Sequence, residues 1–67
     1  MAVATVTKIT AASSKNFDDA VKLGLQRASK TLRGITGLHV LEQKASVTAG
    51  KIAEYRVTME VTFILED

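Results

Sequence analysis

The last third of the chain alternates apolar and polar side chains over an unusual length. This alternation, from Ile52 to about Glu66, predicts a β-strand with one buried face. About fourteen residues at ~3.4 Å each would extend ~48 Å. The opposite face carries mainly arginine, threonine and glutamate, with Ile64 as the exception. The predicted apolar face consists of Tyr55, Val57, Met59, Val61, Phe63 and Leu65.

A helical period precedes this segment. It starts at Phe17 and stops at the break formed by Arg33 and Gly34. Asn16 is a suitable N-cap, although Ser13 or Ser14 could cap instead. The apolar stripe, at ~100° per residue, consists of Phe17, Ala20, Val21, Gly24, Leu25, Ala28, Thr31 and Leu32.

Two residues of the predicted helix stand out from this pattern. Gly24 lies inside the helix, where glycine costs about 1 kcal/mol relative to alanine, and close packing of helix on sheet would explain it. Leu23 lies outside the stripe, among charged residues. We therefore expect Leu23 to be a candidate subunit contact.

Two further strands complete the predicted fold. One is rich in β-branched residues and covers Val3 to Thr10, and the other extends from Leu38 to about Thr48. The segment TAGK then turns the chain into the long last strand. The predicted fold is α+β, in the order β-α-β-β. One domain, residues 1–67, would form a three-stranded antiparallel sheet partly wrapped around one helix.

The predicted elements differ in length. A helix of about 16 residues covers only ~24 Å, half the length of the last strand. The 67 residues include no cysteine and one histidine, so a disulfide or a thiolate metal site cannot stabilise the fold. We therefore expect other subunits to cover the rest of the apolar strand.

Charge and motifs exclude several classes of function. The net charge is +2 and the basic residues are scattered, which does not favour nucleic-acid binding. No segment approaches the ~20 apolar residues of a membrane span, and the start lacks the pattern of a secretory signal, so a cytoplasmic protein is expected. The glycines of GITG and TAGK lack phosphate-loop spacing. The serines near the helix start and the paired acidic residues are better explained by capping and solvation than by catalysis or calcium binding.

Three segments together resemble the dodecin family. They are FDDAVKLGLQRASKTLR, HVLEQ and KIAEYRVTMEVTFILED, and the similarity covers the chain from about Val3 to Asp67. The resemblance implies a hollow homododecamer whose sheet partly wraps the helix of its own subunit. It also implies a non-catalytic protein that stores or buffers a flavin, FMN or riboflavin, in pairs near two-fold axes.

The resemblance also indicates candidate site residues. In flavin-binding dodecins a tryptophan stacks on the flavin ring, and that position matches Gly37 here. A flavin-bonding glutamine matches Arg56 and a glutamate matches His39, so all three positions depart from the family pattern. Leu38 is a further candidate for apolar contact. Reduced or altered flavin affinity is therefore expected.

Two alternatives to flavin storage remain. The segment VLEQ and the pair Tyr55-Arg56 are similar to a calcium-binding dodecin branch that lacks the tryptophan, so a calcium-binding or ligand-free variant is the first alternative. No metal ligands can be assigned from that similarity. An enzyme that uses His39 and Arg56 at a subunit interface is the second, and the chain offers little other catalytic chemistry for it.

Overall fold

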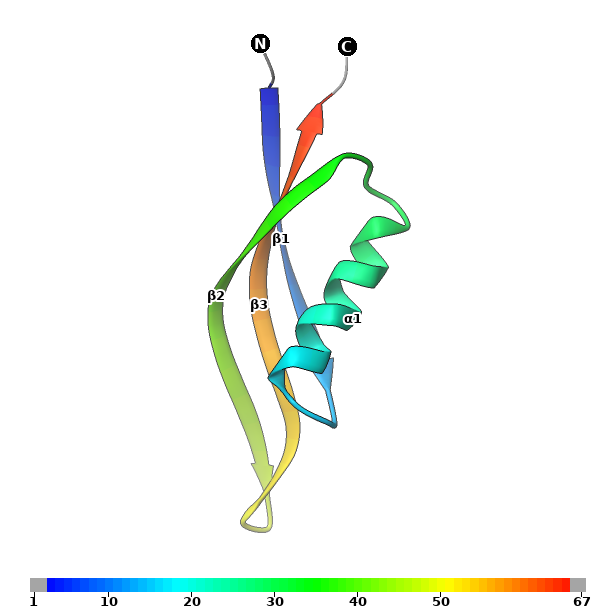
Figure 1. The fold of residues 1–67 in the computed structure, drawn as a ribbon. Helices are drawn as coiled ribbons and strands as arrows, with labels where there is room; N and C mark the ends of the chain where they lie inside the picture. Colours follow the sequence, from blue (N-terminus) through cyan, green and yellow to red (C-terminus); the bar gives the residue numbers. More distant parts are fainter. Residues whose placement is uncertain (1–2, 66–67) are drawn as a thin grey trace.

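The computed structural model describes residues 3–65 and contains one helix and three strands in the order β-α-β-β (Figure 1). The strands are β1 (Val3–Ser13), β2 (Ile35–Thr48) and β3 (Lys51–Leu65), and the helix is α1 (Phe17–Ser29). β3 lies in the middle of the sheet, antiparallel to both neighbours, in the order β1-β3-β2. The α+β fold predicted from the sequence is confirmed.

The core lies where α1 packs on one face of β3. Val57, Met59 and Val61 are completely buried, together with Ala20 of the helix. These β3 side chains alternate with residues that point away from the helix, as the two-residue period predicted. Partly buried side chains from both edge strands, including Ile9 and Val40, pack around this cluster.

Gly24 explains how closely the helix approaches the sheet. A Cβ atom placed on Gly24 would lie 2.7 Å from Cε of Met59 and 3.1 Å from Cβ of Ala11. Both distances are shorter than ordinary van der Waals contacts, so a larger residue would force either the Met59 side chain or the helix to shift. The close packing expected at this position is confirmed.

The start of α1 agrees with the sequence. Asn16 is the N-cap, and its side chain accepts a hydrogen bond of 2.7 Å from the backbone N–H of Asp19. Ser13, an alternative cap candidate, has another role. Its hydroxyl donates to Asp19 Oδ2 at 2.6 Å and accepts from the N–H of Lys15 at 2.9 Å. These bonds tie the end of β1 to the first turn of the helix.

The predicted end of the helix was wrong. α1 ends at Ser29, because the N–H groups of both Thr31 and Leu32 bond to the carbonyl of Ala28 and close the last turn. Gly34 then adopts a left-handed conformation with φ of 73°, and its carbonyl accepts a bond of 3.0 Å from the N–H of Ile64. This bond fixes the chain against β3 immediately before β2.

The predicted strand limits also need correction. β1 continues to Ser13, β2 begins at Ile35 and not at Leu38, and β3 begins at Lys51. Gly37 therefore lies within β2. β2 carries one extra residue at Thr36 and another at Leu41, and the pairing shifts once more near Val47. Such irregularities depend on pairing between strands, which the local sequence pattern does not show.

The molecule is long and thin. Its principal extents are 52 × 19 × 13 Å, and its radius of gyration is 13.8 Å, against about 11 Å for a compact domain of this length. α1 covers only part of the sheet, and the β2–β3 hairpin projects beyond the start of the helix (Figure 1). Among residues 3–65, no helix is long and apolar enough to cross a bilayer.

Candidate ligand-binding face of the sheet

The face of the sheet that points away from α1, here called the open face, carries three of the four predicted site residues. On β3 this face alternates with the buried row and includes Arg56, Glu60 and Thr62. Directly paired residues of antiparallel strands share a face, so Gly37 beside Thr62 and His39 beside Glu60 also belong to the open face.

Leu38, the fourth predicted site residue, lies on the opposite face. It pairs with Val61 and packs against the core cluster beneath α1. Within one subunit its side chain is therefore part of the core and is separated by the sheet from Gly37 and His39. The strand alternation alone predicts this separation, because adjacent residues point to opposite faces.

Gly37 leaves a bare position on the open face. A Cβ atom at Gly37 would have no atom within 4 Å, and its backbone is not left-handed, so a side chain could be added without strain. Its row across the sheet continues through Thr62 to Val6, an exposed valine of β1. Gly37, Thr62 and Val6 therefore form an uncovered, weakly polar row on the open face, here called the Gly37 row.

His39 lies in a charged row next to the Gly37 row. Its Nδ1 atom is 3.9 Å from Oε1 of Glu60, and 74% of the histidine side chain is exposed. On the other side of Glu60, Lys8 of β1 is its cross-strand neighbour. This row can offer both hydrogen-bond donors and acceptors to a polar ligand, but the separation and exposure make the His39–Glu60 pair weak.

Arg56 lies in a second polar cluster, towards the hairpin. Its Nε donates to Oε1 of Glu54 at 2.6 Å, and its cross-strand neighbours are Ala12 and Lys44. Lys44 Nζ lies 3.3 Å from Oε1 of Glu42. Arg56 and Lys44 therefore each have a carboxylate partner on their own strand.

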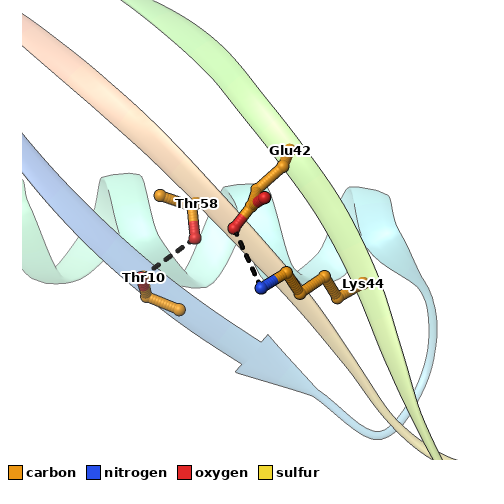
Figure 2. Close-up of polar contacts among 4 residues, drawn as sticks. All are labelled: Thr10, Glu42, Lys44 and Thr58. Atoms are coloured by element: carbon orange, nitrogen blue, oxygen red, sulfur yellow. Dashed lines mark hydrogen bonds and ion pairs between the residues drawn. The ribbon is translucent and has the colours of Figure 1, made fainter.

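The polar network continues between the two clusters. Thr10 and Thr58 share a hydrogen bond of 3.1 Å across β1 and β3, beside the Glu42–Lys44 pair (Figure 2). The helix lies behind the sheet in this view, which places these four side chains on the open face.

The two parts of the predicted site are far apart within one subunit. Arg56 and the β3 partner of Gly37, Thr62, are six positions apart on the same strand. At the rise of a β-strand this separation is about 20 Å. One subunit does not bring Arg56 to Gly37 and His39, so a site that uses all three residues would need a second copy.

The open face has no aromatic ring on which a flavin could stack. The chain has three aromatic residues and no tryptophan. Phe17 and Tyr55 pack edge to face, with ring centroids 5.0 Å apart, and Phe63 belongs to the alternating row of the helix side. The residues around Gly37 therefore fit the polar edge of a flavin better than its ring system.

The described residues of one subunit do not form a calcium site by themselves. Within residues 3–65, no group of three or more histidine, cysteine, aspartate or glutamate side chains is close enough to hold a metal ion. Calcium takes six to eight oxygen ligands, so carboxylates such as Glu42 and Glu60 would have to combine with those of other subunits.

A groove between α1 and β1 was not predicted from the sequence. Its volume is about 480 Å³, and its walls include Ile9, Leu23, Ala28 and Leu32. Leu23, which stands outside the apolar stripe, was the only sequence signal for this groove. Its side chain lies at the groove and is 43% exposed.

Comparison with known proteins agrees with this architecture. The family model described as Dodecin matches residues 3–66. The Dodecin of Thermus thermophilus is 32% identical over 60 residues, which cover 90% of this chain and 87% of that protein.

Solved structures are similar over almost the whole chain. Dodecin from Streptomyces davaonensis has a TM-score of 0.94 and 35% identity, and the match covers 98% of this chain and 97% of that one. The calcium-chelating immunodominant antigen of Mycobacterium tuberculosis, a calcium dodecin with a novel calcium-binding site, has a TM-score of 0.83 and 32% identity, with 96% and 91% coverage. The fold, the family model and these relatives together show that the chain belongs to the dodecin family.

Proposed function

We propose that this protein is a non-catalytic, homododecameric shell that binds and buffers a small ligand between subunits, with a flavin, riboflavin or FMN, as the leading candidate. Membership of the dodecin family supports a small-ligand-binding oligomer. The observation that carries the proposal is the separation of about 20 Å between Arg56 and Gly37 on one face, since only a second copy could complete a site from both.

The proposed flavin affinity is weak. Stacking of a base on an aromatic side chain is worth about 1–3 kcal/mol, and the Gly37 row has no aromatic ring that could make this contact. Arg56 presents hydrogen-bond donors only, whereas a glutamine would present a donor and an acceptor. His39, Glu60 and Arg56 can still bond the polar edge of the ring or a phosphate group.

Quenching of riboflavin fluorescence by the protein tests flavin binding directly. We expect partial quenching at high micromolar protein, and tighter binding by about 5- to 150-fold in the Gly37→Trp variant, because the restored ring adds stacking energy. Gly37→Ala is the matched control, since it fills the same open position without a ring, and its affinity should stay close to that of the parent. Flavin storage is excluded if neither the parent nor Gly37→Trp quenches riboflavin.

Calcium binding is the second candidate, and the similarity to the calcium dodecin of Mycobacterium tuberculosis favours it. Calcium would have to be held by carboxylates of several subunits, because one subunit lacks a suitable cluster among its described residues. Isothermal titration with calcium after chelator treatment tests this candidate. Absence of both heat and a shift in melting temperature would exclude it.

A further inference from the structure

A row of three side chains crosses the open face beside the Gly37 row. Lys8 of β1, Glu60 of β3 and His39 of β2 are cross-strand neighbours in this row. Nδ1 of His39 lies 3.9 Å from Oε1 of Glu60, which is too long for a hydrogen bond, and 74% of the histidine side chain is exposed. The imidazole is therefore accessible to a ligand on the Gly37 row, about 7 Å away along β2.

The net charge of this row depends on His39. With a neutral imidazole, the charges of Lys8 and Glu60 balance each other, and the adjacent Gly37 row carries no charge. Protonation of the imidazole therefore makes this end of the open face positive. His39 is the only histidine of the chain, so no other imidazole contributes to the change.

The other charged side chains of the open face lie towards the hairpin and are paired. Arg56 bonds to Glu54, and Lys44 lies 3.3 Å from Glu42. Arg56 is four positions from Glu60 on β3, a separation of about 13 Å. This exceeds the Debye length of ~8 Å at physiological ionic strength, so these pairs contribute little to the potential at the other end of the face. Helix α1 lies behind the sheet (Figure 2).

The charge of a histidine changes within the physiological range of pH. Histidine is the only side chain whose ordinary ionisation falls between about pH 5 and pH 8. Lysine and glutamate side chains ordinarily keep their charges over this range. The row formed by Lys8, Glu60 and His39 should therefore be close to neutral at about pH 8 and positive at about pH 5.5.

A protonated imidazole can donate a charge-assisted hydrogen bond to a phosphate oxygen. We infer that His39 is a specificity-determining residue, which favours a phosphorylated flavin over the same flavin without phosphate, and that this preference increases as the pH falls. FMN carries the phosphate and riboflavin lacks it, whereas their ring systems are identical. The inference rests on the proposed flavin binding and identifies the residue that selects the ligand by its charge.

The sign of the effect follows from linkage between the proton and the ligand. The anionic ligand binds better when His39 is protonated, so FMN should bind more tightly at acidic pH. An exposed contact of this kind changes the dissociation constant by about 3- to 10-fold. The phosphate loses part of its own charge below about pH 6, which opposes the effect. A variant of His39 is therefore the reference, because the ligand then stays the same.

Quenching of FMN and riboflavin fluorescence at about pH 5.5 and about pH 8 tests the inference. Both the parent and the Gly37→Trp background are measured, because stacking strengthens binding in the latter. Relative to His39→Gln, which cannot be protonated, the histidine protein should bind FMN about 3- to 10-fold more tightly at the acidic pH and equally at the basic pH. The affinity for riboflavin should differ by less than about twofold.

His39→Lys is the second variant, since its side chain is charged at both pH values. It should bind FMN more tightly than His39→Gln at both pH values, without the change that the histidine protein shows. Circular dichroism and native mass spectrometry at each pH check that the variants fold and assemble like the parent, as expected for substitutions at an exposed position.

The outcomes separate this inference from the proposed function. A gain in FMN affinity at acidic pH that needs His39 and is absent with riboflavin supports the inference. The same pH dependence in His39→Gln, or an equal response of FMN and riboflavin, overturns it and leaves flavin binding intact. Absence of quenching of both flavins at both pH values, in the parent and in Gly37→Trp, overturns the proposed function and the inference together.

Discussion

The two faces of this sheet differ in how they are packed and in whether they are accessible to a ligand. On the helix side, Val57, Met59 and Val61 are completely buried and pack against α1. On the open face, Arg56 and Glu60 make exposed or half-buried ion pairs on a surface that the chain itself leaves uncovered. The first face supplies the stability of the subunit. The second can change residue by residue, as at Gly37, without disturbing the fold.

The largest expected effect is on the helix side. Met59→Ala removes most of a completely buried side chain at the centre of the core, so the free energy of unfolding should fall by about 2–5 kcal/mol. Thr58→Ala, the next residue on the opposite face, should cost about 1 kcal/mol or less because it removes one exposed hydrogen bond. Urea denaturation at fixed protein concentration measures both. Equal losses would show that the faces do not differ as described.

A pair of glycines sharpens the comparison. Gly24→Val introduces a branched side chain where even a Cβ would meet Met59 and Ala11, so we expect a loss of about 1–3 kcal/mol. Gly37→Val adds the same atoms on the open face, where nothing lies within 4 Å, and should change stability by about 0.5 kcal/mol or less. Thermal unfolding of both variants provides the measurement. A larger loss from Gly37→Val would show that a side chain at this position is not free of contacts within the subunit.

A smaller effect is expected at the start of the helix. Asn16→Ala removes the side-chain acceptor of the Asp19 N–H and should cost about 1 kcal/mol. Lys15→Ala, at the preceding exposed position, is the control and should cost much less. Urea denaturation distinguishes them, and an unchanged midpoint for Asn16→Ala would mean that Ser13 compensates for the lost cap.

The smallest effect on stability is expected at Arg56. Arg56→Gln removes an exposed ion pair with Glu54 and should change the free energy of unfolding by about 0.5 kcal/mol or less. In the Gly37→Trp background, the same substitution should strengthen riboflavin quenching, since glutamine supplies an acceptor as well as a donor. Weaker quenching would show that the arginine itself contacts the ligand.

The sequence predicted those features that depend on local chemistry and period. The alternation in β3 identified the buried row, and Asn16 was identified as a cap from its position before the first turn. The helix end was wrong because it depends on bonds from Thr31 and Leu32 to Ala28 and on the tie between Gly34 and Ile64. The apolar period of the sequence continues beyond Ser29 to Leu32, so it does not show that the helix ends at Ser29.

The candidate site was less predictable. Alternation places Gly37 and His39 together and Leu38 on the other face. The separation of Arg56 from Gly37 follows from the register of β2 on β3, which includes an extra residue at Thr36 and another at Leu41. Register is set by pairing between strands, and for the same reason the groove beside Leu23 appears only when α1 is placed against β1.

Native mass spectrometry of the purified protein at micromolar concentration tests the central claim most directly, namely that this elongated subunit is completed by other copies of itself. We predict a discrete closed assembly, a homododecamer, with little free subunit. A folded monomer of 7.2 kDa as the dominant species would contradict the claim and, with it, the ligand site between subunits.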